Sequence, residues 1–155
     1  MFYESIAKVY DYIFPKNRKQ LEFVESIKKI SIEEKILDIG CATGNLTELL
    51  GEKTGNVVGI DLDKELLKEA KDKHPNLNFE NMNMLEVNEK FEENSFDRVV
   101  SFGNTLVHLD SREEVEEFFQ KVYKTLKFNG FFIVQIINYN RVIEKNIKNL
   151  PNIDN

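Results

Sequence analysis

Two aspartates and a turn of small residues form the strongest chemical feature of this sequence. The run "ILDIGCATGNLTELL" (residues 36–50) places Asp38, Gly40, Ala42 and Gly44 between an apolar stretch and a helical pattern, and Asp61 follows 21 residues after Gly40. Small residues are needed where a backbone takes unusual dihedral angles or where a ligand touches it. The spacing therefore predicts a ligand that lies against this turn.

The turn differs from the dinucleotide-binding fingerprint. That fingerprint, G-x-G-x-x-G, seats a pyrophosphate on the N-terminus of a helix. Here Ala42 replaces the middle glycine and Asn45 takes the place of the third. A carboxylate at Asp38 would repel phosphate but could hold an ammonium group, directly or through water, and Asp61 could accept both hydroxyls of a ribose. The pattern favours a nucleoside with a positively charged amino-acid tail over a dinucleotide.

The apolar spacing around this turn predicts strands that alternate with helices. Strands are expected at 35–39, 56–61, 77–81, 96–102 and 131–137. Helices are expected before Pro15 and at 18–30, 45–53, 64–74 and from Ser111 to near 127–130. This alternation predicts an α/β fold, a Rossmann-like, doubly wound and mostly parallel sheet with helices on both faces. In such a sheet the ligand lies at the carboxyl ends of the strands, where Asp38 and Asp61 stand.

Local signals set the expected ends of the last helix and strand. Ser111 and Glu114 form a capping-box pair, and Asn129-Gly130 is the expected C-terminal stop. The run "FFIVQII" that follows is almost entirely apolar, as in a strand covered on both faces. The stretch "EVNEKFEENS" (86–95) and the end of the chain are polar, and neither predicts a further strand.

Composition narrows the function classes. The formal charge is −6 and there are one cysteine and two histidines in 155 residues. The acidic balance argues against a nucleic-acid partner, and the few sulfur and imidazole groups argue against a metal site. The sequence holds no apolar run of membrane-spanning length and no signal-peptide pattern, so we expect a cytoplasmic protein without a membrane partner.

The motifs "ILDIGCATG" and "VVGID" resemble the first two motifs of the class I S-adenosylmethionine (SAM)-dependent methyltransferases, and the resemblance spans about 3–139. It implies that SAM is the cofactor and S-adenosylhomocysteine the product. By this resemblance the methionine part of SAM contacts Asp38, Gly40, Cys41, Ala42 and Gly44. Asp61 would bind the ribose and Leu62 would pack near the adenine. In "NMNML", Asn83 and Met84 would read the adenine edge, with Asn81 and Met82 as the alternative pair.

Two later stretches resemble the small-molecule, glycine and sugar-amine N-methyltransferase-like group. "SFGNTLVHL" is similar to its "GNS-x-x-HL" stretch, which implies that the Phe102 backbone and His108 lie beside SAM and that Asn104 faces the substrate. "QIINYNRV" is similar to its "NYD" stretch, which implies substrate contacts from Asn138 and Tyr139. Asn140 departs from the aspartate of that pattern.

The N-terminal stretch "YESIAKVYDYIFPKNR" resembles the lid helix of the same group. The resemblance implies a tyrosine near the sulfonium and an arginine at the SAM carboxylate, and Tyr10 and Arg18 are the choices, with Tyr3 and Tyr12 as alternatives. We hypothesise that Tyr10 guides the methyl group and that His108, or a water, relays a proton. Packing alone would equally explain Tyr10, and a backbone contact would explain His108. His74 is expected to mark a helix end, and Cys41 to pack without reacting.

Together these features predict one SAM-binding domain over 1–155, with N-terminal helices or a lid at 1–34, the core at 35–140 and a short or truncated tail at 141–155. The expected function is methyl transfer to a small-molecule acceptor, an amine being favoured. The alternatives are a non-catalytic SAM-binding subunit and, more remotely, an NAD-dependent dehydrogenase. The family's C-terminal antiparallel hairpin is missing here, so the last strand would be a bare edge that a homodimer could cover.

Overall fold

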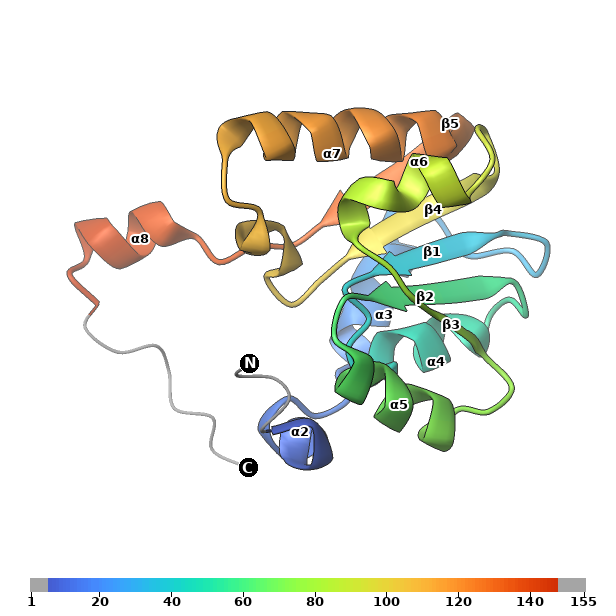
Figure 1. The fold of residues 1–155 in the computed structure, drawn as a ribbon, viewed down its shortest axis with the longest axis horizontal. Coiled ribbons are helices and arrows are strands. Elements are labelled where there is room, and N and C mark those ends of the chain that lie inside the picture. The colour runs from blue at the N-terminus through green and yellow to red at the C-terminus, as the bar shows by residue number, and fades with distance from the viewer. Residues whose placement is uncertain (1–5, 148–155) are drawn as a thin grey trace.

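A five-stranded parallel sheet forms the centre of the molecule (Figure 1). The computed structural model describes residues 6–147. The strand order is β3-β2-β1-β4-β5, and every neighbouring pair is parallel. The strands are β1 (Ile36–Ile39), β2 (Val57–Asp61), β3 (Asn78–Asn81), β4 (Phe96–Ser101) and β5 (Leu126–Val134). The predicted Rossmann-like α/β fold is confirmed, and the strand order reverses between β1 and β4.

Helices cover both faces of this sheet (Figure 1). One face carries α3 (Arg18–Ile27), α4 (Asn45–Gly51) and α5 (Lys64–Lys73). The other face carries α6 (Val87–Lys90) and α7 (Arg112–Thr125). Four shorter elements complete the order: η1 (Ala7–Val9) and α2 (Tyr10–Ile13) before α3, η2 (Met84–Glu86) before α6, and η3 (Thr105–His108) before α7. The last described helix is α8 (Tyr139–Glu144).

Strand β1 is buried on both faces, which explains its short, continuous apolar run. Ile36 belongs to the core cluster beneath α3 and α4, whereas Leu37 belongs to the cluster beneath α6 and α7. Because side chains alternate along a strand, Asp38 points to the same face as Ile36. This places the carboxylate of Asp38 beneath α4, at the carboxyl end of the sheet.

The prediction for the end of the last helix was wrong. Helix α7 ends at Thr125 and β5 already begins at Leu126, so Asn129 and Gly130 lie within the strand. The pairing with β4 jumps from Phe96↔Leu126 to Arg98↔Phe131, and Asn129 has a φ of 63°. Asn-Gly suits a left-handed backbone in a bulge as well as at a helix end, and pairing with β4 decided between the two. Strand β5 also ends three residues earlier than expected.

Other boundaries differ from the prediction in smaller ways. Helix α3 ends at Ile27 instead of near residue 30, and the first helix is divided into η1 and α2. The polar stretch after β3 contains η2 and α6, and the polar end of the chain contains α8. Within residues 6–147, no strand follows β5, and no helix is long and apolar enough to cross a membrane.

Candidate functional site

The turn after β1 has an unusual backbone. Gly40 and Gly44 have φ angles of +76° and +81°, and Ala42 between them has a φ of 48°. The backbone N–H groups of Gly40 and Cys41 both donate to the carbonyl of Ile60, at 2.8 and 3.0 Å. The turn is therefore fixed to β2, and its left-handed residues explain the need for glycine.

The chain itself also requires these small residues. A Cβ atom on Gly40 would lie 2.2 Å from the hydroxyl oxygen of Thr105, and one on Gly44 would lie 2.7 Å from the ring of Phe79. The sequence predicted small residues for unusual backbone angles and for a ligand that lies against the turn. The structure adds two protein neighbours that a larger residue would displace. They are Thr105, in the loop after β4, beside Gly40, and Phe79, in β3, beside Gly44.

Asp38 is a buried carboxylate with one hydrogen-bond donor in the described structure. Its side chain is 2% exposed, and the hydroxyl of Thr47 in α4 donates to it at 2.6 Å. Burial raises the pKa of Asp38 to about 7; the Thr47 hydrogen bond opposes this rise, and the charge of Asp61 adds to it. A cation placed beside this carboxylate would stabilise its charged form.

Asp61, at the end of β2, is hydrogen-bonded to two backbone N–H groups. Ala42 N–H donates to one carboxylate oxygen and Asp63 N–H to the other, both at 2.9 Å. Burial raises the pKa of Asp61, against the lowering effect of these two hydrogen bonds. Since an ionised carboxylate has about four acceptor positions, room remains for two hydroxyl donors. The structure thus brings Asp38 and Asp61 to the two sides of one turn, as predicted from their spacing.

The loops after β2 and β3 bring the predicted adenine-side residues together. The Asn81 side-chain amide donates to the carbonyls of Asp61 and Leu62, at 3.0 and 2.8 Å, so Asn81 holds this loop. Met82 is buried in the core at 4% exposure, whereas Met84 is half-buried and Leu62 is exposed. Asn83 caps η2 by accepting from Leu85 N–H at 2.9 Å. Of the two methionines, Met84 lies nearer the surface, whereas Asn81 is exposed and Asn83 is half-buried.

The loop after β4 meets the segment after β5. The amide of Asn104 donates to the hydroxyl of Tyr139 at 2.8 Å, and its carbonyl accepts from Ile137 N–H at 3.0 Å. Asn138 caps α8 by accepting from Arg141 N–H. Two predicted substrate residues, Asn104 and Tyr139, are therefore in direct contact, and Asn138 is their neighbour.

Phe102 and His108 stand at the two ends of this same loop. Phe102 is buried, its ring packs edge-on to that of Phe23 in α3 at 6.5 Å, and its carbonyl accepts from the Thr105 hydroxyl. His108 ends η3 and is exposed. Thr105, which holds the Phe102 carbonyl, is also the residue that a Cβ on Gly40 would meet.

The N-terminal residues divide into those near the turn and those away from it. Tyr10 in α2 is half-buried and stacks near the ring of Phe14 at 4.8 Å, while Tyr12 is 76% exposed. Arg18 instead pairs with Glu52 at 3.1 Å, just beyond α4. Because α4 has seven residues and spans about 10 Å, Arg18 is not brought to the glycine turn. The alternative Tyr3 lies outside the described residues.

Two residues near the turn were missed or undervalued by sequence analysis. Asp11 in α2 bonds to Thr43 and Asn45, a tertiary contact that no local pattern indicates. His74 does end α5 as predicted, yet its ring also lies against Gly44 and its Nδ1 is 3.8 Å from Glu48. Burial lowers the pKa of His74.

Cys41 is buried, and burial together with the nearby Asp38 raises the pKa of its thiol, which supports the packing role expected for it.

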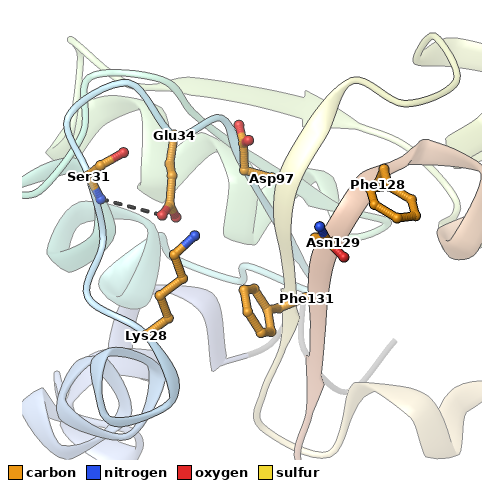
Figure 2. A pocket seen from close by; sticks show the side chains of 8 residues that line it. Lys28, Ser31, Glu34, Asp97, Phe128, Asn129 and Phe131 are labelled. Carbon is orange, nitrogen blue, oxygen red and sulfur yellow. Dashed lines mark hydrogen bonds between the residues drawn. The ribbon is translucent and has the colours of Figure 1, made fainter.

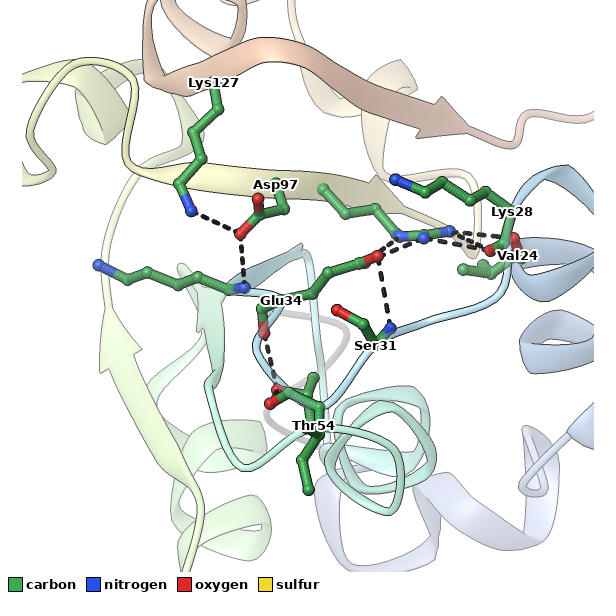
Figure 3. Close-up of polar contacts among 10 residues, drawn as sticks. Val24, Lys28, Ser31, Glu34, Thr54, Asp97 and Lys127 are labelled. Carbon is green, nitrogen blue, oxygen red and sulfur yellow. Dashed lines mark hydrogen bonds and ion pairs between the residues drawn. The ribbon is translucent and has the colours of Figure 1, made fainter.

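A separate cavity of about 190 Å³ lies at the opposite, amino-terminal edge of the sheet (Figure 2). It is lined by Lys28, Ser31, Glu34, Asp97 and the bulge of β5. Beside it, the guanidinium of buried Arg98 donates to Glu34 at 2.9 Å and to the carbonyls of Val24 and Lys28 (Figure 3). This network joins the end of α3 to β4, and Arg98 is in register with Ile36, two residues before Asp38 on β1.

Comparisons with known proteins agree with this geometry. The sequence profile of the methyltransferase domain family matches residues 36–130, which include the turn and both aspartates. The chain belongs to the class I SAM-dependent methyltransferase family. SAM is therefore the cofactor that family membership assigns to the site.

Individual relatives of this chain support the same family assignment. A putative methyltransferase of Geobacillus is 32% identical over 145 residues, and the putative methyltransferase YqeM of Bacillus subtilis is 31% identical over 150 residues. These matches cover 88% and 93% of this chain, and 58% and 59% of the relatives. The chain thus spans less than two thirds of the length of these relatives.

Solved structures show the same fold at lower identity. A SAM-dependent methyltransferase from Clostridium acetobutylicum has a TM-score of 0.74 and 23% identity, and the match covers 94% of this chain and 61% of that one. SAM-bound CalS10, an amino pentose methyltransferase from Micromonospora echinaspora, has a TM-score of 0.71 and 17% identity, and the match covers 84% of this chain and 55% of that one. At these identities the two matches show a shared fold and no more.

The residues around the turn fit the cofactor of this family. SAM carries an ammonium, a ribose with two hydroxyls and an adenine. The buried carboxylate of Asp38 suits the ammonium, the remaining acceptor positions of Asp61 suit the ribose, and the half-buried Met84 suits an apolar ring. The Gly40–Gly44 turn between the two carboxylates supplies a backbone with small side chains.

Proposed function

We propose that this chain binds SAM and catalyses methyl transfer to a small-molecule acceptor, with an amine favoured. The observation that carries the proposal is the placement of two partly desolvated carboxylates, Asp38 and Asp61, on either side of one left-handed turn. A pyrophosphate would meet two negative charges there. In a ribose that carries a zwitterionic amino-acid tail, the ammonium would meet one carboxylate and the ribose hydroxyls would meet the other.

The cofactor-binding roles follow the position of each residue. Asp38 holds the ammonium and Asp61 accepts the ribose hydroxyls. The adenine packs on Leu62 and Met84 and is read by Asn83. The backbone of the turn, with Gly40, Cys41, Ala42 and Gly44, lies along the amino-acid tail, while the Phe102 backbone and His108 border it from the β4 side. The contribution proposed for Arg18 at the tail carboxylate requires that it leave Glu52.

Bound SAM would supply a methyl group on a positively charged sulfur, so the protein need not provide a nucleophile. The residues of the chain would align the acceptor with that methyl group, and positioning of this kind contributes up to about 7–11 kcal/mol to a reaction. Tyr10 is proposed to guide the methyl group through its hydroxyl oxygen. His108, or a water, is proposed to take the proton that an amine acceptor must lose.

The acceptor site is proposed to lie between the loop after β4 and the segment after β5. Asn104, Asn138 and Tyr139 border it with uncharged hydrogen-bonding groups. A site of this kind suits a neutral polar acceptor, and removal of water favours the neutral form of an amine. The formal charge of −6 supports a small molecule over a nucleic acid.

Calorimetry with SAM, S-adenosylhomocysteine and NAD tests the proposed cofactor. The parent should bind the first two and not NAD, and Asp61→Ala should weaken SAM binding by about tenfold or more, because it removes two charge-assisted hydrogen bonds. Asp72→Ala, which removes an exposed carboxylate of α5, is the matched control. Binding of NAD without binding of SAM would refute the proposal.

Single-turnover methyl transfer to a panel of small amines and alcohols tests the catalytic roles. Tyr10→Phe and His108→Ala should each slow the transfer, while Tyr123→Phe, at an exposed site on α7, should not. Rates within about a factor of two of the parent would remove Tyr10 and His108 from the mechanism. Tight SAM binding without transfer to any acceptor would instead favour a non-catalytic SAM-binding subunit.

We further propose that two copies of the chain associate through β5. In the described part of the chain, β5 pairs only with β4, and Phe128 at its start is 92% exposed. An unpaired apolar edge strand is a template for association with another strand. Native mass spectrometry should detect a dimer, and a monomer at micromolar concentration would argue against this pairing.

A further inference from the structure

One carboxylate in α2 connects three separate parts of the molecule. An oxygen of Asp11 accepts hydrogen bonds from the Thr43 hydroxyl at 2.5 Å and from the Asn45 side-chain amide at 3.1 Å. Its other oxygen pairs with the ammonium of Lys73 at the end of α5. Asp11 therefore ties the N-terminal segment both to the turn of residues 40–44, here called the cofactor turn, and to α5.

These contacts differ from an ordinary surface ion pair. Thr43 is 1% exposed, and the side chains of Asp11 and Lys73 are only about one third exposed. Partial burial alone would raise the pKa of Asp11, but hydrogen bonds from Lys73 and Thr43 outweigh it and lower the pKa. The carboxylate is thus held in its charged form at the edge of the turn.

The N-terminal segment needs such an anchor. Helix α2 has four residues and η1 has three, and such short helices are unstable on their own in water. Of these seven residues, only Ala7 is buried. The Asn45 amide also donates to the carbonyl of Phe14 at 3.4 Å, which fixes the end of α2. Polar contacts centred on Asp11, more than apolar burial, hold this segment.

We propose that Asp11 is a positioning residue that latches residues 7–13 onto the cofactor turn and thereby slows release of the cofactor. Tyr10 directly precedes Asp11, so the latch also sets where the Tyr10 side chain lies. The inference about cofactor release depends on the proposed function, because it assumes that SAM lies against the turn. Opening of the latch frees the segment without disturbing β1 or the buried core.

The experiment compares Asp11→Ala, Thr43→Val and their double variant with the parent. Stopped-flow measurement of S-adenosylhomocysteine release should show about tenfold faster dissociation in each single variant, equivalent to about 1.4 kcal/mol. The double variant should be little faster than Asp11→Ala, because Asp11→Ala already removes the contact with Thr43. Asp11→Asn, which keeps an acceptor for Thr43 but loses the charge, should fall between the parent and Asp11→Ala.

Lys16→Met is the matched control. Lys16 belongs to the same N-terminal stretch and pairs with Glu48 of α4, but this pair does not involve the turn. Its variant should release S-adenosylhomocysteine at the parental rate. Equal acceleration in Lys16→Met and Asp11→Ala would overturn the latch, because any loss of charge in the stretch would then suffice.

Hydrogen–deuterium exchange without ligand separates the latch from the proposed function. In Asp11→Ala, residues 7–13 should exchange faster while β1 and β4 keep the parental rates. If the parent binds no S-adenosylhomocysteine, the proposed function fails, and this exchange pattern alone decides the latch. Unchanged exchange in residues 7–13, or equally accelerated exchange in β1, would overturn the proposal.

Discussion

The replacement Asp38→Asn should stabilise the protein at alkaline pH while removing its affinity for SAM. Asp38 is 2% exposed and accepts one hydrogen bond, from Thr47. Asparagine keeps the shape and an acceptor for Thr47, but it carries no charge. The change therefore removes the desolvated charge that we propose as the partner of the SAM ammonium, and little else.

The magnitude follows from the pKa of Asp38, which burial raises from 3.8 to about 7. The folded state then holds more protons than the unfolded state between these two values, so the free energy of unfolding falls as the pH rises through this window. With about 1.4 kcal/mol for each pKa unit, the full effect above pH 7 is about 4 kcal/mol. Between about pH 5 and about pH 8 the free energy of unfolding of the parent should fall by roughly 2–3 kcal/mol, whereas that of Asp38→Asn should not.

Urea denaturation of both proteins at the two pH values measures this difference. The exposed Asp72→Asn variant should follow the parent at both pH values and serves as the control. Calorimetry at the higher pH should show loss of SAM binding in Asp38→Asn alone. An unfolding difference between the parent and Asp38→Asn that does not change with pH would refute the assignment of the raised pKa to Asp38.

Three further outcomes are expected. Gly40→Ala should destabilise the fold by more than about 1 kcal/mol in urea denaturation, because the φ of Gly40 is +76° and the new Cβ would overlap Thr105. Arg98→Leu should lower the free energy of unfolding, measured in the same way, by about 3–5 kcal/mol, because it leaves the charge of the buried Glu34 carboxylate without its partner. Adding Glu34→Leu should restore part of this free energy. Cys41 should resist a thiol reagent in the folded protein and react only as fast as the protein unfolds, since it is buried and its pKa is raised; rapid labelling would contradict this.

The parts of the site that follow strands were predictable from sequence. Asp38 and Asp61 end two neighbouring parallel strands, and the carboxyl ends of parallel strands meet at one edge of the sheet. Their proximity therefore follows from strand order alone. The contact between Asn104 and Tyr139 was foreseeable for the same reason, because both residues follow the ends of neighbouring strands.

Other features depended on contacts between segments that no local pattern encodes. Asn129-Gly130 has the composition of a helix end, but pairing of Leu126 with Phe96 drew the preceding residues into β5. Arg18 is predicted to meet the carboxylate of SAM, and in the structure it pairs with Glu52 beyond α4. Local sequence permits both outcomes in each case, and packing against a distant segment selects one.

The sequence by itself determined the alternating α/β order, the glycine turn and the two carboxylates beside it, because hydrophobic period and backbone chemistry are local properties. Only the tertiary structure revealed that Asp11 joins the N-terminal segment to that turn, and that Gly40 must be small for Thr105 as well as for a ligand. It also showed that burial shifts the pKa of Asp38. These properties arise from residues distant in the chain that exclude water from one another, so they exist only once the chain has folded.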